Sequence, residues 1–342
     1  MKFGNVTIKD IAKELNLSAS TVSRALRGSN EISHETTKMV LELAEKINYR
    51  PNPIALSLKE GRSRAIGVVV SEIANTFFSE AINGIESIAY NRGYHVVINQ
   101  SHESEEREKV NVMHHASRSV DGLLISLSSG TVDLTYLKDL HKKGLPIVFF
   151  DRITDEIETH KVTANNYLGA LQATEHLILQ GFKKIAHITS APYLSITKER
   201  LQGYKEALEK HCIPFNESLI KHCNHGGMIA KEVEDAIVEL FKGKSKPDAI
   251  FTASDRITVV CFAALRHLKH EKEVGFAGFS NTKVGDLFDP PMTVVEQPAF
   301  EIGQSATEML IQMIESKIPV TDFETKIIDT KLIIRKSSMK RK

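Results

Sequence analysis

From residue 64 onward, short apolar runs rich in β-branched residues alternate with segments of helical periodicity. The run AIGVVV at 65–70 is continuous, which is typical of a strand buried on both faces of a parallel sheet. A helix is predicted to follow over residues 78–92, with Gly93 as its stop. Further strands are predicted at 96–98, 122–125, 147–150, 185–188, 249–251 and 274–279. This alternation predicts an α/β core of two doubly wound parallel-sheet halves, the second beginning near Asn165.

The first fifty residues have a different pattern, that of three short helices. Thr7 is a good N-cap, with Asp10 at position N3, for a helix over residues 8–15. Ser18 caps a second helix after a tight turn at 16–17, and Ser33 caps a third. Two short helices joined by so brief a turn predict an N-terminal all-α helix-turn-helix domain, with a plain three-helix bundle as the alternative.

The second of these helices carries side chains that favour contact with DNA. Its outward positions are Ala19, Ser20, Thr21, Ser23 and Arg24. Small hydroxyl residues let a helix approach phosphates closely, and an arginine can donate two hydrogen bonds to guanine O6 and N7. Residues 1–64 hold 11 Lys and Arg against 7 Asp and Glu, whereas the whole chain has a net charge of only +1. Because this excess is mild, it does not establish nucleic-acid binding by itself.

A short helix is predicted between this head and the core. Pro51 stops the third helix, Asn52 caps a new one, and Gly61 ends it after barely two turns. Isolated helices below about 12 residues are marginal in water, so this one should form only when something packs against it. Its apolar side chains are Ile54, Ala55 and Leu58. A second copy of the same helix and the minor groove of DNA would cover them.

Three stretches make the chain similar to a known family. VTIKDIA at 6–12, LSASTVSR at 17–24 and YRPN at 49–52 resemble the DNA-binding head of the LacI/GalR family of bacterial repressors, and the resemblance extends over almost the whole chain. It implies a homodimer on a pseudo-palindromic operator in double-stranded DNA, with recognition helices in the major groove and hinge helices in the central minor groove. Leu58 matches the leucine that opens a base step there, while Ala19 and Ser20 match positions that set operator preference. The residues expected to contact DNA are Thr7, Ser18, Ala19, Ser20, Thr21, Ser23, Arg24, Asn52, Ala55 and Leu58.

Polar and aromatic residues follow the predicted strands, at the edge where ligands bind in open parallel sheets. Asp151 follows the strand at 147–150, and Ser280 follows the strand at 274–279. Hydrogen-bonding groups beside aromatic rings suit a sugar or a similar polar molecule. The resemblance places FFDR at 149–152, RLQGY at 200–204, ASD at 253–255, GFSN at 278–281 and EQP at 296–298 along an effector cleft. The expected effector-binding residues are Phe77, Phe78, Asp151, Arg200, Ser254, Asp255, Ser280 and Gln297.

Two of these positions depart from the family pattern. Ser280 stands where many members have an aspartate that binds sugar hydroxyls, and Ser254 stands where an asparagine is frequent. The effector is therefore expected to be a sugar or a sugar phosphate, and the loss of a charge and an amide at these positions slightly favours a phosphorylated or acidic sugar. The resemblance implies a repressor of transcription whose operator affinity changes when the effector binds between two subdomains of the core. Whether the effector releases DNA or promotes its binding cannot be read from the residues.

The chain is expected to divide at residues 50 and 63. The helix-turn-helix domain takes 1–50, the hinge helix and linker 51–63, and the effector-binding and dimerisation core 64–338. The resemblance implies a core like that of periplasmic binding proteins, with an N-subdomain of 64–163 plus 294–327 and a C-subdomain of 164–291 plus 328–338. The strand at 293–296 and the helix at 300–315 are thus expected to complete the first half. The basic segment at 335–342 is expected to be a frayed end.

Composition and motifs argue against several other classes. The first residues do not form a secretory signal, no window is apolar enough for a membrane helix, and three cysteines provide no disulfide framework, so we expect a cytoplasmic protein with no membrane partner. The usual dinucleotide, phosphate-loop, zinc-protease and nucleophile motifs are missing, which predicts no enzymatic activity and no cofactor. No metal is expected at 211–212 or 222–225, because the His and Cys spacing there is unlike that of zinc sites, and His114 and His115 are expected on a helix surface. The alternatives are an exported solute-binding protein and a sugar-converting α/β enzyme.

Overall fold

The computed structural model describes residues 6–50, 62–118, 120–242, 246–270 and 274–340. The chain forms two compact units, residues 1–63 and 64–342, and each is described by itself. The predicted hinge helix at 51–61 lies outside the described residues.

The first unit consists of three helices around a small apolar core. These are α1 (Ile8–Glu14), α2 (Ala19–Ala25) and α3 (His34–Lys46), and Ile11, Val22 and Val40 are fully buried between them. The Asp10 carboxylate accepts a hydrogen bond from the backbone N–H of Thr7 at 2.8 Å, and Ser18 Oγ accepts one from the backbone N–H of Thr21 at 3.0 Å. These caps confirm the predicted starts of the first two helices.

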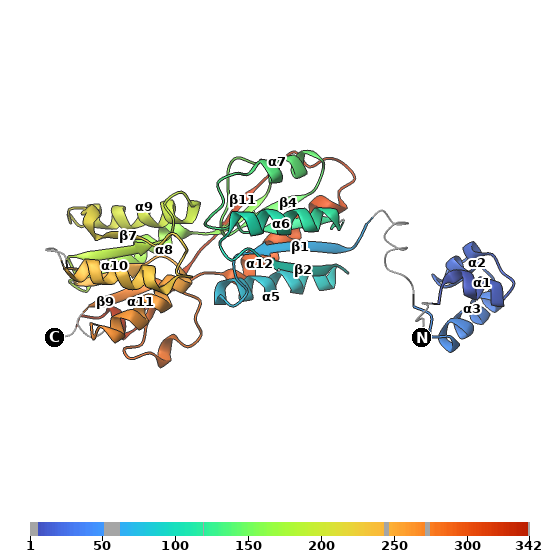
Figure 1. Ribbon diagram of the computed structural model, residues 1–342, viewed down its shortest axis with the longest axis horizontal. Helices are drawn as coiled ribbons and strands as arrows, with labels where there is room; N and C mark the ends of the chain where they lie inside the picture. Colours follow the sequence, from blue (N-terminus) through green and yellow to red (C-terminus); the bar gives the residue numbers. More distant parts are fainter. Residues whose placement is uncertain (1–5, 51–61, 119, 243–245, 271–273, 341–342) are drawn as a thin grey trace. The chain divides into compact units, whose positions relative to one another are not determined.

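The second unit contains two subdomains, and the N-subdomain is built on a six-stranded parallel sheet (Figure 1). The spatial order of its strands is β11-β5-β4-β3-β1-β2. The strands are β1 (Ala65–Val70), β2 (His95–Gln100), β3 (Gly122–Ile125), β4 (Ile147–Phe150), β5 (Lys161–Ala164) and β11 (Thr325–Ile328). The helices are α5 (Thr76–Asn91), α6 (Glu105–Ser117), α7 (Thr135–Lys142) and α12 (Ala299–Glu315).

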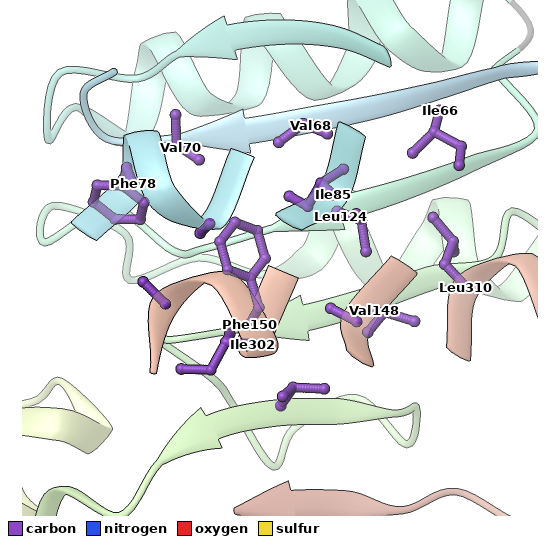
Figure 2. Packing of buried hydrophobic residues seen from close by; sticks show 14 of the residues in the cluster. Ile66, Val68, Val70, Phe78, Ile85, Leu124, Val148, Phe150, Ile302 and Leu310 are labelled. Carbon is purple, nitrogen blue, oxygen red and sulfur yellow. The ribbon is translucent and has the colours of Figure 1, made fainter. Parts of the chain in front are cut away.

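Helices cover both faces of this sheet. Val68 and Val70 of β1 belong to the cluster that packs under α5 and α12, whereas Val69 belongs to the cluster under α6 and α7. Figure 2 shows Val68, Phe150 and Ile302 in the first of these clusters. Because successive side chains of a strand point to opposite faces, a continuous apolar run such as β1 requires both layers of helices.

The C-subdomain has a second six-stranded sheet with the order β12-β10-β9-β8-β6-β7. All of its strand pairs are parallel except the antiparallel pair of β10 and β12. The strands are β6 (Ile185–Thr189), β7 (Ile220–His222), β8 (Ala249–Thr252), β9 (Gly275–Phe279), β10 (Thr293–Glu296) and β12 (Lys331–Ile333). Helices α8 (Asn166–Leu179) and α9 (Ser195–Lys210) cover one face, and α10 (Ala230–Lys242) and α11 (Asp255–His267) cover the other.

The prediction that the strand at 293–296 completes the first half is wrong. β10 pairs in parallel with β9, with Thr293 opposite Ala277 and Val295 opposite Phe279, so it belongs to the C-subdomain. The chain crosses to the N-subdomain only after Glu296, and α12 then packs on the N-subdomain sheet as predicted. The apolar residues of β10 could be buried in either sheet, and hydrophobic pattern alone does not choose a strand's neighbour.

The prediction of a frayed C-terminal end is also wrong for the described residues up to 340. Ser337 and Ser338 are buried, and Ser338 Oγ lies 2.7 Å from His176 Nε2 in α8. Arg335 pairs with the Asp286 carboxylate. The segment is basic, which suggested a solvated end. The hydrogen bonds that its two serines make to the C-subdomain nevertheless hold it against the core.

His115 lies in the core and not on the helix surface where it was expected. Its ring, on α6, faces Gly67 of β1, and a Cβ atom at position 67 would lie 2.8 Å from the imidazole. His114 is exposed, as predicted. Gly67 therefore provides the space that the His115 ring occupies.

Candidate DNA interface and effector cleft

The outward face of α2 presents the residues that the sequence pattern singled out. Ala19, Ser20 and Arg24 are exposed, while Thr21 and Ser23 are half-buried. Ser18 Oγ lies 2.8 Å from both Ser20 Oγ and Thr21 Oγ1, so three hydroxyl groups cluster at the start of the helix. Donor groups at a helix N-terminus, where the dipole is positive, suit contact with a phosphate.

Arg24 has a charged neighbour that the sequence pattern did not indicate. Its guanidinium group lies 3.0 Å from the carboxylate of Glu31, which follows α2. The two side chains are 51% and 70% exposed, and an ion pair this exposed contributes at most about 1 kcal/mol. Arg24 is therefore accessible to a stronger partner.

Not all the expected DNA contacts can be placed. Thr7 is exposed at the start of α1, where its hydroxyl donates to Asp10 at 2.7 Å. Asn52, Ala55 and Leu58 lie outside the described residues, so their expected contacts stay predictions.

In the core, small hydroxyl residues follow the strands of both sheets. They are buried at the carboxyl ends of the strands, where ligands bind in parallel sheets. In the N-subdomain they are Ser71 after β1, Ser101 after β2 and Ser126 after β3. In the C-subdomain they are Ser190 after β6 and Ser280 after β9. The two subdomains contact each other near these polar strand ends, and we call this boundary between them the candidate cleft.

Arg200 of α9 is buried in the C-subdomain wall of this cleft. Its Nε and Nη2 donate to Asn166 Oδ1 at 2.9 and 2.6 Å, and it also bonds to the Ala253 carbonyl and to Gln297 Oε1. Its guanidinium carbon lies 3.9 Å from the centre of the Phe279 ring. Burial lowers the pKa of Arg200 to about 10, although the nearby Asp151 carboxylate favours the charged form. The structure therefore brings Arg200 and Gln297 together.

Asp151 lies at the end of β4 with φ +60°, in the left-handed region. Its buried carboxylate accepts a hydrogen bond from Ser126 Oγ at 3.3 Å, and burial raises the pKa of this carboxyl group. A non-glycine residue in this conformation is uncommon, and it costs about 1–3 kcal/mol that the surrounding structure must offset.

The next residue, Arg152, forms a buried bidentate pair with Glu103. Nη1 donates to Oε2 at 2.6 Å and Nη2 donates to Oε1 at 2.9 Å. Burial disfavours the charge on Arg152, but Glu103 outweighs this effect and raises the pKa of Arg152. Glu103 also accepts the backbone N–H of Ser129 at 2.6 Å, so this pair is fixed to the loop after β3.

Asp255 and Ser280 meet on the C-subdomain side. Ser280 Oγ donates to the Asp255 carboxylate at 2.5 Å, and the backbone N–H of Asn281 donates to the same oxygen at 3.1 Å. Burial raises the pKa of Asp255. The cap of α11 is Ser254, whose Oγ accepts the N–H of Ile257 at 3.3 Å, so Asp255 is the first residue of the helix and not its cap. A carboxylate is thus present beside Ser280, contributed by the neighbouring loop.

Phe77 and Phe78 are buried at the start of α5. Their ring centres are 5.2 Å apart, and the Phe78 ring lies 6.5 Å from that of Phe150, next to Asp151. The aromatic pair therefore closes the N-subdomain core at the cleft end of its sheet.

The sequence pattern missed two residues of the cleft. Glu103 comes three residues after β2, and the rule that functional groups follow strands was a signal that could have indicated it. Asn166 follows β5, a strand that was not predicted, so no signal pointed to it.

Several contacts link the two subdomains across the cleft. Arg256 of α11 pairs with Glu72, which follows β1, and Tyr193 bonds to the carbonyl of Ser129. Glu80 of α5 pairs with Lys283 at 2.7 Å and accepts a hydrogen bond from Asn281 Nδ2, also at 2.7 Å. These contacts exist only while the subdomains lie together.

The described part of the chain contains neither a cluster of metal ligands nor a helix that could cross a membrane. No group of three or more His, Cys, Asp or Glu side chains gathers there as ligands. No helix within the described ranges has the length and apolar character needed to cross a membrane.

Family comparisons match both units of the chain. Residues 7–52 match the model of bacterial regulatory proteins of the lacI family. Residues 63–337 match the model of periplasmic binding proteins and the sugar binding domain of the LacI family.

Individual relatives resemble the chain over most of its length. The repressor PurR of Vibrio atlanticus is 30% identical over 313 residues, which cover 91% of this chain and 92% of the relative. The ribose operon repressor of Haemophilus influenzae is 30% identical over 337 residues, covering 97% and 98%. The solved complex of the transcriptional regulator CelR with cellobiose has a TM-score of 0.70 at 27% identity, covering 97% of this chain and 100% of the other. The chain therefore belongs to the LacI family of bacterial regulatory proteins.

Proposed function

We propose that this protein is a sequence-specific repressor of transcription whose affinity for its operator depends on a small, carbohydrate-like effector. One observation carries the proposal: the same chain holds a DNA-binding face and a ligand-binding core. The exposed face of α2 presents clustered hydroxyls and Arg24, and the two sheets of the core place buried polar groups at one cleft. A solute-binding protein would have no use for such a head.

On the DNA side, α2 enters the major groove of each half-site. Ala19, Ser20 and Arg24 contact base edges, while Thr7, Ser18, Thr21 and Ser23 contact the backbone. A homodimer places two such heads on a pseudo-palindromic operator. Asn52, Ala55 and Leu58 of the paired hinge helices contact its minor groove, where the two Leu58 side chains open the central step.

On the effector side, Asp151, Arg200, Asp255, Ser280 and Gln297 bind or position a polar ligand. Their buried hydrogen-bonding groups support this role. Ser254, Phe77 and Phe78 shape the walls beside them. The names of two relatives, a ribose operon repressor and a regulator solved with cellobiose, favour a carbohydrate-like molecule.

The effector acts by linkage between the two sites. A ligand that binds one arrangement of the subdomains more tightly changes the spacing of the hinge segments and so the operator affinity. A coupling of about 1–3 kcal/mol corresponds to a change of roughly 5 to 150 fold.

Capture of genomic fragments on the full-length protein, with and without a panel of sugars, tests the proposal. We expect enrichment of pseudo-palindromic sites and a change in their affinity with one sugar class. Failure to prefer any duplex would overturn the DNA role. Turnover of a sugar in the same panel would favour an enzyme.

Leu58→Ala tests the hinge separately. Operator affinity should fall by about 2 kcal/mol, because the wedge that holds the central step open is lost. Effector affinity should stay unchanged, since Leu58 lies outside the core. Unchanged operator binding would show that Leu58 does not open a base step in the minor groove.

A further inference from the structure

We infer that the cleft takes an uncharged, polyhydroxylated ligand and rejects a phosphorylated or carboxylated one. The inference rests on the proposed function, because it names the class of effector that the site binds. It chooses the neutral sugar, against the slight preference for a phosphorylated or acidic sugar that the residues at 254 and 280 gave.

The first argument is that the cations that could receive an anion are already held. Arg152 and Arg200 are the two buried arginines of the described core. Both terminal nitrogens of Arg152 donate to Glu103, at 2.6 and 2.9 Å. Arg200 is bonded to Asn166, to Gln297 and to the Ala253 carbonyl, and its face lies on the Phe279 ring. Arg256 at the rim pairs with Glu72.

The second argument is the cost of displacing these partners. The Arg152 and Glu103 side chains are only 8% and 6% exposed. If a phosphate took Arg152, the Glu103 carboxylate would remain buried without its counter-ion, a strongly unfavourable arrangement. Asp151 and Asp255 add two more carboxyl groups near the same strand ends, and neither offers a positive charge to an anion.

The third argument comes from the polar atoms that have no partner. Within the described residues these include Ser101 Oγ in the N-subdomain, and Thr189 Oγ1 and Ser190 Oγ in the C-subdomain. Arg152 Nε has no hydrogen-bond partner either, but it lies 3.9 Å from the Asp151 carboxylate. All four residues are buried and lie at or just after the carboxyl ends of β2, β4 and β6. Three of the four atoms are hydroxyls, which both donate and accept. Sugar hydroxyls have the same dual character, whereas a phosphate dianion only accepts.

Inorganic phosphate tests the inference without knowledge of the natural ligand. Thermal unfolding of the full-length protein is followed in increasing phosphate, against chloride at matched pH and ionic strength. The wild-type protein should show no saturable rise in the Tm of its core. Glu103→Gln releases Arg152, and this variant should gain a saturable rise of roughly 2–4 °C.

Two variants serve as controls. Glu105→Gln removes a carboxylate from the same segment as Glu103. The Glu105 carboxylate accepts hydrogen bonds from the backbone N–H groups of Val132 and Asp133 and holds no arginine, so this variant should respond like the wild type. A saturable response of the wild type that Arg152→Gln abolishes would overturn the inference, and so would a folded Glu103→Gln variant without any response. The head is common to all variants, so its own phosphate binding cancels.

A second measurement uses the wild type alone, in case Glu103→Gln does not fold. Ribose is compared with ribose 5-phosphate, and glucose with glucose 6-phosphate, for their effect on operator binding. The neutral member should act at a roughly tenfold or more lower concentration, because the anion must break charged hydrogen bonds. A phosphorylated sugar that acts as well as its parent would overturn the inference and leave the proposed function standing. If no sugar of either kind acts, the proposed effector control fails. The phosphate titration then still decides whether the cleft accepts an anion.

Discussion

Arg24 is the residue of the head whose contacts must change most on DNA. In the free head it lies 3.0 Å from Glu31 in an exposed ion pair, which contributes at most about 1 kcal/mol. A bidentate contact to guanine contributes about 1–3 kcal/mol of discrimination, so the guanidinium should exchange its partner. Arg24→Ala should cost about 1–3 kcal/mol on the operator and relax preference at one guanine. Titration of operators substituted at each position measures both effects.

Lys38→Ala is the matched control, because Lys38 is an exposed cation of α3 whose ion-pair partner is Glu42, at 3.9 Å. It should leave base preference unchanged. If Arg24→Ala weakens binding equally on every duplex, Arg24 contacts only phosphate and the base-reading role is lost.

His115 makes the stability of the core depend on pH. Burial lowers its pKa from 6.5 to about 4, because the ring sits under Gly67 in the sheet. Between these two values the unfolded chain binds the proton and the folded chain does not, so stability is complete above pH 6.5 and is lost as the pH falls toward 4. From pH 6.5 to pH 5 the loss from this residue is about 2 kcal/mol.

His115→Leu should remove that part of the pH dependence, and denaturant unfolding at pH 7.5 and pH 5 measures it. His114→Leu changes the exposed neighbour in the same way and should leave most of the dependence in place, because burial lowers the His115 pKa more than the charge of His114 does. Equal pH dependence in both variants would mean that His115 is not the group that titrates.

Helices α5 and α12 approach each other through two glycines. A Cβ atom at Gly84 would lie 2.1 Å from the carbonyl oxygen of Phe300, and one at Gly303 would lie 2.0 Å from that of Ala81. Helix propensity alone says that Gly→Ala stabilises a helix by about 1 kcal/mol, but overpacking costs typically 1–3 kcal/mol. We therefore expect Gly303→Ala to destabilise the protein in denaturant unfolding. Glu86→Ala, on the exposed side of α5, should change the stability by no more than about 0.5 kcal/mol, and a more stable Gly303→Ala variant would contradict the close approach.

Elements with a continuous apolar run were predictable, and elements without one were not. Strands β1, β3 and β4 are buried along nearly their whole length, so their residues had to be apolar. Strands β7, β11 and β12 are short and partly exposed at sheet edges, so their sequences carry no comparable run. The residues of β10 predicted a strand correctly, but its neighbour is set by tertiary packing that no local pattern records.

At the scale of the whole molecule, the cleft could be located from the sequence but its hydrogen-bonding network could not. Asp151 and Ser280 were found because they directly follow strands, and Asp255 because it comes three residues after β8. The partners that hold the buried arginines come from residues far away in the chain: Glu103 lies 49 positions from Arg152, and Gln297 lies 97 positions from Arg200. Such pairs depend on how the strands are ordered in the sheets, so the charge state of the cleft became clear only with the fold.

The contacts across the cleft should set how strongly the effector and the operator influence each other. Arg256 pairs with Glu72 of the other subdomain, and both side chains are at least two-thirds buried. Arg256→Gln removes this pair and should change the coupling free energy by about 0.5–2 kcal/mol. Because linkage is reciprocal, the effector's influence on operator affinity and the operator's influence on effector affinity must change by the same factor. Titrations in both directions measure the two factors.

Lys231→Ala is the control for this coupling, because Lys231 pairs with Asp235 within α10 and does not cross the cleft. It should leave both factors as in the wild type. An unchanged coupling in Arg256→Gln would show that the subdomains communicate without this pair. The Glu80 contacts to Lys283 and Asn281 would then be the contacts that hold the cleft closed.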